Sequence, residues 1–208
     1  DTYKPADMPM AYGANNHGSI VQIKDQWYIF YHRHTNGSWY SRQGCAEPIS
    51  IAEDGSIEQV EITSCGLNGG PLAGQGEYPA YLACHLFTDE PSMYVGGDAF
   101  PKVMQDGKDG DEEIGYVGNV QNSATIGFKY FDMKNVKKIR VTMRGYISGN
   151  IEVRLTWDGD VLASLPIEFT NVWETYESEI EIPDGIHSLY FTFRGDGNGA
   201  LKSFELLV

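Results

Sequence analysis

Histidine side chains gather in two short segments of the N-terminal third of the chain. His17 precedes Gly18, and a neighbouring glycine lets a ligand approach an imidazole closely. His17 could therefore bind a metal or line an active site, although a capping or turn histidine is the simpler interpretation. His32 and His34 stand two residues apart, which places both imidazoles on one face of a strand. Because no carboxylate or cysteine nearby completes a metal site, we interpret them as exposed polar residues at a strand end.

Arg42 lies in the middle of a strand-like segment, Ser38–Gly44. Its planar guanidinium presents several N–H donors that suit sugar hydroxyls or a carboxylate. It could equally form a surface salt bridge. The residues alone leave both interpretations open.

The carboxylate pair that a glycosidase needs is not recognisable in the first 65 residues. Such a pair consists of two positioned carboxyl groups, one of them with a raised pKa. The acidic residues there fall on turn tips or outward-facing strand positions, with Glu47 as the exception. The sequence also lacks a nucleophile elbow and a phosphate-binding loop. We therefore predict no catalytic residue in this chain.

An acidic, glycine-containing loop includes Asp109, Asp111 and Glu113. Loops rich in oxygen ligands suit calcium. The spacing does not match the twelve-residue helical calcium loop, because no glutamate follows at its last position. Calcium binding is thus one hypothesis, and a solvated acidic turn is the other.

Several aromatic residues of the C-terminal part could stack on the C–H faces of sugars. Trp173 lies at a loop-to-strand junction and is the better stacking candidate, whereas Trp157 falls on an inward-alternating position and is predicted to lie in the core. Core packing remains the alternative for each aromatic residue.

Composition excludes some classes of partner. The 208 residues carry a formal net charge of −14, which repels nucleic acid and anionic lipid but is compatible with neutral sugars. We therefore expect no nucleic-acid partner and no membrane partner. The three cysteines are Cys45, Cys65 and Cys84, so at least one thiol is free or pairs outside the chain.

The first 65 residues read as a small set of strands that cannot form a complete core. Trp27–Tyr31 is apolar on both faces, so neighbours must cover it on both sides. A meander of this length is about the size of one β-propeller blade, which is buried only against other blades. Residues 66–78 contain glycines and Pro71 and are the best linker candidate. The expected strands are Gly18–Ile23, Trp27–His32, Ser38–Gly44, Ile49–Ala52 and Ile57–Ile62.

The C-terminal part alternates between apolar and polar residues with a period of two. The apolar positions include Ile139, Val141 and Met143, then Ile151 to Trp157, then Leu189 to Phe193. Each segment predicts an antiparallel strand with one buried face. Short strands at regular spacing, without helices, indicate a β-sandwich or jelly roll.

Four N-terminal segments form a recognisable series, namely Asn16–Gln22, Trp27–Arg33, Ser41–Gln43 and Glu47–Ile49. Together they resemble the last blade of glycoside hydrolase family 43, which comprises five-bladed propeller enzymes acting on arabinose- and xylose-containing polysaccharides. The resemblance implies that His17 lies near the propeller axis and helps to hold calcium, and that Arg42 contacts substrate. It also implies that the catalytic carboxylates come from earlier blades.

Five C-terminal segments form a second series, namely Glu113–Tyr116, Phe128–Phe131, Val136–Gly145, Thr170–Trp173 and Asp184–Arg194. They resemble a carbohydrate-binding module of family 6, which implies that Tyr116 and Trp173 are its stacking aromatics. The asparagine and aspartate usual near the end of that family are replaced here by Ala200 and Lys202. Sugar binding in the usual cleft is therefore in doubt, and so is calcium binding.

These inferences combine into an all-β protein. Residues 1–65 are expected to form the final blade of a five-bladed propeller, 66–78 a linker and 79–208 a family 6-like sandwich. The chain would be the C-terminal portion of an inverting arabinofuranosidase or xylosidase, inactive alone. The alternatives are a non-catalytic module for xylan or arabinan and a sandwich that only stabilises the propeller.

The expected partners are a plant polysaccharide and an N-terminal propeller segment, in the same or a second chain. The expected location is outside the cell, with a cytoplasmic role on imported oligosaccharides as the alternative.

Overall fold

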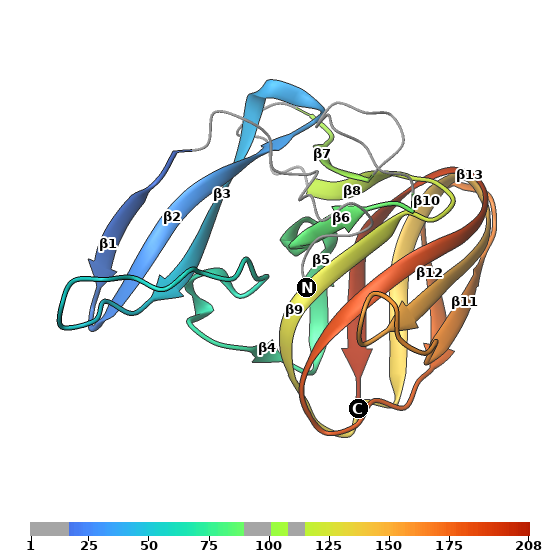
Figure 1. Cartoon of the computed structure of the whole chain (residues 1–208). Helices are drawn as coiled ribbons and strands as arrows, with labels where there is room; N and C mark the ends of the chain where they lie inside the picture. Colours follow the sequence, from blue (N-terminus) through green and yellow to red (C-terminus); the bar gives the residue numbers. More distant parts are fainter. Residues whose placement is uncertain (1–16, 90–100, 108–114) are drawn as a thin grey trace.

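The computed structural model describes residues 17–89, 101–107 and 115–208, and Figure 1 shows two β-rich units side by side. Apart from two short 3-10 helices, the regular elements in these ranges are strands, which confirms the predicted all-β class. Within the same ranges no helix is long and apolar enough to cross a membrane.

The N-terminal sheet contains β1 (Ser19–Ile23), β2 (Gln26–Thr35) and β3 (Ser38–Ile49), paired antiparallel in that order. Asn36 and Gly37 join β2 to β3 with φ angles of 55° and 59°. Two consecutive positive φ angles are typical of a tight type I′ hairpin turn, for which Asn-Gly is a preferred sequence. This turn therefore fixes the register of the two longest strands of the sheet.

The chain after β3 differs from the prediction. Strands were expected at Ile49–Ala52 and Ile57–Ile62, but the structure has only an isolated bridge between Ile51 and Ile57. The expected turn between them is present, since the Ala52 N–H donates to the Ser56 carbonyl at 2.9 Å. Ile51 and Ile57 are 39% and 40% exposed, so little packing is available to extend the bridge into a ladder.

Strand β1 is apolar in sequence yet exposed. All five of its residues are exposed, including Ile20, Val21 and Ile23 at 40–44%. An exposed apolar edge strand is a site where another chain segment can pair or pack.

The remaining strands form one continuous sheet of ten strands that folds over into a sandwich. Residues 66–78, expected to be a linker, carry η1, β4 and β5, and both strands pair with strands of the sandwich. The elements are η1 (Gly66–Asn68), β4 (Leu72–Ala73), β5 (Gly76–Pro79), η2 (Ala80–Leu82), β6 (His85–Phe87), β7 (Lys102–Gln105), β8 (Gly115–Val120), β9 (Thr125–Met133), β10 (Lys138–Arg154), β11 (Ala163–Ile167), β12 (Thr170–Glu179) and β13 (Gly185–Leu207).

Strands β10 and β13 pass from one layer of the sandwich to the other. Their ladder runs from the Lys138–Leu207 pair to the Arg154–Tyr190 pair. One half of the ladder is flanked by β12 and β8, and the other half by β11 and β9. Between the halves, Gly145 pairs with Gly199, and a Cβ on either would crowd the opposite strand. These glycines allow the two strands to bend together.

The core lies between the two layers and follows the predicted alternation. Ile139, Val141 and Met143 are fully buried, and so are Phe191 and Phe193. Burying a large apolar side chain contributes about 1.5–3 kcal/mol relative to exposing it. The aromatic centre of this core is made by Phe128, Phe131, Phe191 and Phe204, whose ring contacts span 4.7–5.8 Å between centroids.

A buried arginine joins the N-terminal sheet to the sandwich. Arg33 is 4% exposed, and its terminal nitrogens donate to the carbonyl oxygens of Tyr81 and Ala83, at η2. Its Nε donates to Gln43 Oε1 at 2.7 Å, and Gln43 in turn donates to the Tyr81 carbonyl at 3.1 Å. The positive charge is thus satisfied by neutral oxygens of both units.

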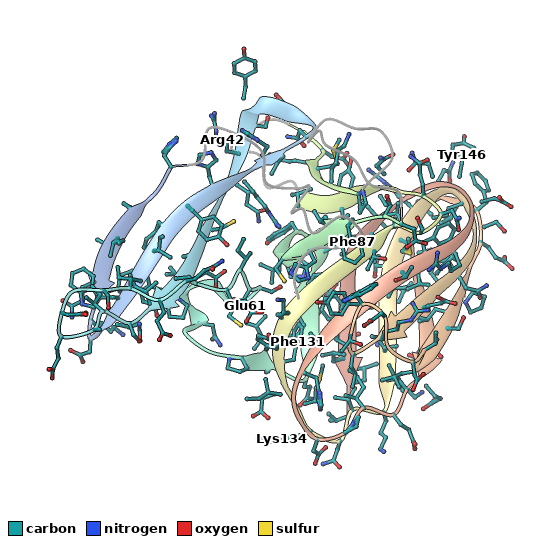
Figure 2. The ribbon with its side chains drawn as sticks, in the orientation of Figure 1. Arg42, Glu61, Phe87, Phe131, Lys134 and Tyr146 are labelled. Atoms are coloured by element: carbon teal, nitrogen blue, oxygen red, sulfur yellow. The ribbon has the colours of Figure 1, made fainter. Side chains whose placement is uncertain are left out.

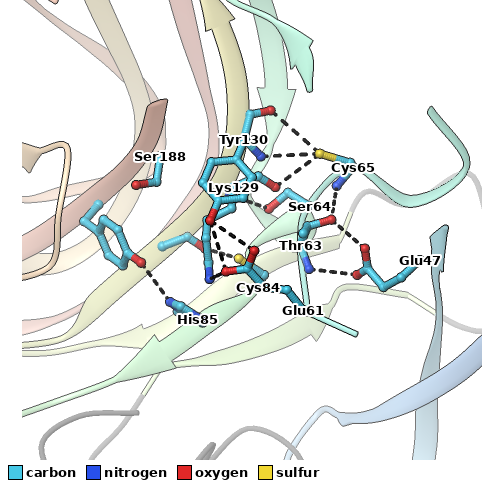
Figure 3. A network of polar contacts seen from close by, with 12 residues as sticks. Glu47, Glu61, Thr63, Ser64, Cys65, Cys84, His85, Lys129, Tyr130 and Ser188 are labelled. Carbon is cyan, nitrogen blue, oxygen red and sulfur yellow. Dashed lines mark hydrogen bonds and ion pairs between the residues drawn. The ribbon is translucent and has the colours of Figure 1, made fainter. Parts of the chain in front are cut away.

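A second polar network ties the segment after β3 to β9 (Figure 3). Lys129, which is 4% exposed, pairs with Glu61 at 2.5 Å, and Tyr130 donates to the same carboxylate at 3.0 Å. The Ser64 N–H donates to the Lys129 carbonyl, and Cys65 contacts the backbone of both Lys129 and Tyr130. All three cysteines are free thiols. The network holds residues 61–65 along the sandwich.

The turn of the N-terminal sheet makes a third contact between the units. The Asn36 N–H donates to the Val103 carbonyl at 2.8 Å, and the Gln105 N–H donates to Asn36 Oδ1 at 2.9 Å. Strand β7 is an edge strand, so the turn covers part of an otherwise open edge.

We predict that Arg33→Ala lowers the free energy of unfolding by about 2–4 kcal/mol, because it removes charged hydrogen bonds and leaves the Ala83 carbonyl buried without that donor. Urea unfolding of both proteins measures the change. Arg42→Ala is the matched control, since Arg42 is an exposed arginine on the adjacent strand, and it should change stability by less than about 0.5 kcal/mol. Equal losses in the two variants would contradict the assigned role.

The second prediction concerns His85, whose Nδ1 lies 3.0 Å from the Tyr190 hydroxyl. Burial, assisted by the Lys129 charge, lowers the pKa of His85 from 6.5 to about 3. Between these values the unfolded chain binds a proton that the folded chain does not, so stability falls as the pH falls. The loss approaches about 1.4 kcal/mol per pH unit. Urea unfolding at several pH values should show a shallower dependence for His85→Gln than for the unmodified chain, and equal slopes would refute the prediction.

Candidate functional site

A groove of about 520 Å³ lies at the end of the sandwich where β10 and β13 bend. Residues of β7, β8, β10, β12 and β13 line it, together with Asn36 and Gly37 of the N-terminal sheet. The groove is thus shared by both units. Figure 2 labels Tyr146, one of its lining residues, at this end of the sandwich.

Tyr116 and Trp173, the two predicted stacking residues, lie next to each other beside this groove. Their ring centroids are 5.6 Å apart, with 63° between the ring planes. Both side chains are partly buried. Tyr116 comes from β8 and Trp173 from β12, so the tertiary structure brings together residues that are 57 positions apart in the sequence.

Arg144 of β10 occupies the space beside both rings. Its guanidinium carbon lies 4.2 Å from the Trp173 ring centroid and 5.3 Å from that of Tyr116. A cation at such distances is attracted to the electron-rich ring faces. Arg144 also pairs with Asp106 at 2.6 Å, and the Tyr116 hydroxyl donates to the other oxygen of Asp106 at 3.0 Å. Burial raises the pKa of Tyr116, so the phenol stays protonated and keeps donating.

Two irregularities in the strand pairing position these side chains. Met143 pairs with Glu174 and Gly145 with Thr170, so Arg144 alone faces three residues of β12, the last of which is Trp173. On the other side of β10, Lys202 is an extra residue of β13 between paired neighbours. Bulges of this kind re-aim side chains. Here the Lys202 ammonium comes to lie 5.9 Å from the Trp173 ring centroid.

The arrangement leaves no room for a sugar between the two rings. A sugar ring held between aromatic faces needs about 7–8 Å, twice a contact distance of 3.5–4 Å. The centroids are only 5.6 Å apart, and Arg144 already covers Trp173. Arg144 alternates with the apolar residues Ile139, Val141 and Met143, so the sequence pattern predicts an outward-facing side chain but not this contact with Trp173. The alternation along β10 shows which way the Arg144 side chain points, but it does not show which residue that side chain contacts.

Other aromatic predictions had different outcomes. Trp157 was predicted to lie in the core, and this was wrong, because β10 ends at Arg154 and Trp157 lies half-buried in the turn that follows. Tyr146 is 77% exposed and lines the groove, a role that the sequence did not indicate.

Arg42 lies on β3, away from this groove, and His17 lies just before β1 (Figure 2 labels Arg42). The His17 and His32 rings are in contact at 4.6 Å between centroids, and His32 lies 6.0 Å from His34. His34 pairs with Arg42 across the ladder, so the three imidazoles and the guanidinium follow one face of the sheet. Both His17 and Arg42 are exposed.

The proposed calcium ligands receive no support from this arrangement. Asp109, Asp111 and Glu113 lie outside the described residues. Within the described ranges, no three histidine, cysteine or carboxylate side chains come close enough to hold a metal ion. The ring in contact with His17 is the imidazole of His32, whereas calcium prefers oxygen ligands. Calcium binding stays a prediction that rests on residues outside the described ranges.

Glu47 and Glu61 border a second hollow, beside Tyr130, but their oxygens are engaged by the chain itself. Glu47 is 2% exposed and accepts from the Thr63 N–H at 2.8 Å, from the Thr63 hydroxyl at 2.6 Å and from Tyr31 at 3.1 Å. Burial raises the pKa of Glu47 despite these donors. Because both carboxylates are satisfied internally, we interpret them as structural groups at the junction of the two units.

The family model described as "Carbohydrate binding module (family 6)" matches residues 103–206. This chain therefore belongs to carbohydrate-binding module family 6.

Longer proteins match the chain over nearly its whole length. It is 58% identical over 212 residues to a "Xylosidase/arabinosidase" of Thermoclostridium stercorarium, covering 99% of this chain and 45% of that protein. A family 43 arabinoxylan arabinofuranohydrolase from Bacillus subtilis, solved with cellotetraose, has a similar fold with a TM-score of 0.60 and 21% identity, covering 95% of this chain and 42% of that one. The chain thus spans less than half the length of these relatives.

The sandwich by itself also matches isolated modules. A family 6 module from Clostridium cellulolyticum, solved with xylose, superimposes with a TM-score of 0.53 and 17% identity, covering 65% of this chain and 99% of that one. At this identity the comparison supports the fold alone.

We predict that Arg144→Ala exposes Trp173 to solvent, because the guanidinium at 4.2 Å no longer covers its ring. Acrylamide quenching of tryptophan fluorescence measures this, and the same substitution in a Trp173→Phe background identifies the tryptophan responsible. Arg140→Ala is the matched control, since Arg140 lies on the same strand but pairs with Glu177 and Glu205. Unchanged quenching in Arg144→Ala would show that the guanidinium does not cover the ring.

Proposed function

We propose that this chain is the part of a glycoside hydrolase for arabinose- and xylose-containing polysaccharides that joins the last propeller blade to a family 6 module. The observation that carries the proposal is the exposure of the N-terminal sheet. Its apolar outer strand β1 is exposed, whereas Arg33 of β2 fixes the sheet to the sandwich. A sheet of three strands with such an edge is stable as part of a larger sheet assembly. The 58% identity to a longer xylosidase/arabinosidase supports it.

In this proposal the remaining blades pack against β1 and supply the catalytic carboxylates. One carboxylate activates water and the other protonates the leaving oxygen, with inversion at the sugar. His17 and Arg42 follow the same face of the N-terminal sheet, and both are exposed. They would face the substrate and contribute to binding rather than to the chemical step. Because polysaccharides of this size do not cross a cell membrane, the proposed enzyme would act outside the cell. Calcium would bind near the acidic loop or the propeller axis.

The junction gives the sandwich a defined place in such an enzyme. Arg33, the Lys129–Glu61 pair and the Asn36 turn hold the two units at three separate points. A module tethered only by a flexible linker would need none of these contacts. The groove shared by Asn36, Gly37 and the sandwich would then keep a constant position relative to the propeller.

The corresponding test compares the chain alone with a completed enzyme. The isolated 208-residue chain should not hydrolyse aryl arabinofuranosides or xylosides. A fusion to the portion of the Thermoclostridium stercorarium relative that it does not match should restore hydrolysis. In that fusion, Arg42→Ala should lower kcat/KM by about 10–100-fold, the effect of losing a charged hydrogen bond to substrate. Arg140→Ala should leave kcat/KM unchanged.

Hydrolysis by the isolated chain would refute the proposal that the catalytic carboxylates lie in the remaining blades, outside this chain. An active fusion in which Arg42→Ala has no effect would remove Arg42 from the substrate site. An inactive but folded fusion would contradict the assignment as a propeller blade.

A further inference from the structure

We propose that the groove binds a neutral pyranose chain on a platform formed by Tyr146 and Phe169, rather than between Tyr116 and Trp173. The inference deepens the proposed carbohydrate function and assigns the ligand to particular side chains. Its ligand class is an uncharged polysaccharide backbone of the xylan type.

The platform consists of two exposed rings in contact. Tyr146 is 77% exposed and Phe169 56%, and their centroids are 4.7 Å apart with 38° between the planes. Exposed aromatic faces of this kind stack on the C–H faces of sugars, because the contact removes apolar area from water. A sugar on Trp173 would first have to displace the Arg144 guanidinium. Among exposed tyrosines in the described ranges, Tyr146 is the one that lines the groove.

The bend of β10 and β13 explains why Tyr146 faces outward. The residue follows Gly145, and Gly197 of the facing strand has a φ of 93°, where a Cβ would collide with the Tyr146 carbonyl. Ile147, the next residue, is 2% exposed and anchors the bend in the core. The tyrosine ring is therefore presented to solvent by a backbone that the core holds in place.

Amide side chains stand where they could bond the hydroxyls of a stacked sugar. Asn198 pairs with Tyr146 across the ladder, and its Nδ2 donates to Asn119 Oδ1 at 2.9 Å. This bond orients the carboxamide, and none of the described residues is seen donating to its Oδ1. Asn171, at the bulge of β12, lines the same groove. A ring platform beside fixed amides matches the few polar groups and apolar walls typical of small-ligand sites.

The charges favour a neutral ligand. Arg144 and Lys102 are the two cations that line the groove, and Arg144 is paired with Asp106 at 2.6 Å, so the charge of Arg144 is already balanced. The same pair closes the space between Tyr116 and Trp173. The nearest open aromatic face in the groove then belongs to Tyr146, whose neighbour two residues earlier in β10 is Arg144 itself.

A protein partner fits this patch less well. The exposed apolar side chains there are Tyr146, Phe169 and Val172. Stable protein interfaces bury about 800 Å² on each partner, over some 20–30 residues. The three side chains fall well short of that area, whereas one stacked sugar needs little more than a single ring.

The test is isothermal titration calorimetry of the full 208-residue chain with xylohexaose, and affinity electrophoresis in soluble arabinoxylan. Tyr146→Ala should weaken binding at least tenfold, and Phe169→Ala should weaken it less. Tyr40→Ala is the matched control, because Tyr40 is a tyrosine of β3 that is 92% exposed, and it should leave affinity unchanged. Trp173→Ala should change affinity by less than threefold. Equal urea midpoints for Tyr146→Ala and the unmodified chain would show that the fold is intact.

Two results would overturn the inference. The first is binding that is lost in Trp173→Ala but kept in Tyr146→Ala, since the ligand would then sit on the aromatic pair after Arg144 moves. The second is no binding of either sugar by the folded chain. Neither result bears on hydrolysis by the completed enzyme, so the proposed function is decided separately.

Discussion

The ladder between β10 and β13 is the constraint on which the rest of the sandwich depends. It is continuous from the Lys138–Leu207 pair to the Arg154–Tyr190 pair, and it contributes strands to both layers. Because each strand crosses from one layer to the other, the bend at the Gly145–Gly199 pair determines how the layers face each other. The buried faces of both halves meet in the phenylalanine cluster, while the bend itself creates the groove at the end of the molecule.

Buried charges define how the two units meet. Arg33 and Lys129 are each 4% exposed, and each is satisfied by groups of the other unit or of the segment that joins them. Desolvating a charge is costly unless its hydrogen bonds are complete, so such contacts tolerate few relative orientations of the units. An apolar junction of similar area could slide, whereas this one fixes the groove relative to the N-terminal sheet.

Arg144 determines which aromatic side chains of the groove are open to a ligand. An aromatic pair at a sandwich end would be open to a sugar if nothing lay beside it. Arg144, anchored by Asp106, instead stacks on Trp173, and the open aromatic surface is found at Tyr146 and Phe169. Ala200 and Lys202, which stand where the resemblance to family 6 implies an asparagine and an aspartate, both lie near this site. Ala200 lines the groove without offering a hydrogen bond, and Lys202 adds a cation near Trp173.

The sequence by itself determined the class of fold, the buried faces of the main strands and the family. Alternation with a period of two is a local property, so it identified Ile139, Val141 and Met143, and likewise Phe191 and Phe193, as core. The resemblance to family 6, in turn, named Tyr116 and Trp173 together as stacking residues.

Local patterns could not show where strands end, which is why Trp157 was assigned to the core and why strands were expected after Ile49. Only the tertiary structure decided that Arg144 covers Trp173 and that Tyr146 is open, because both follow from bulges and a bend set by residues far apart in the chain.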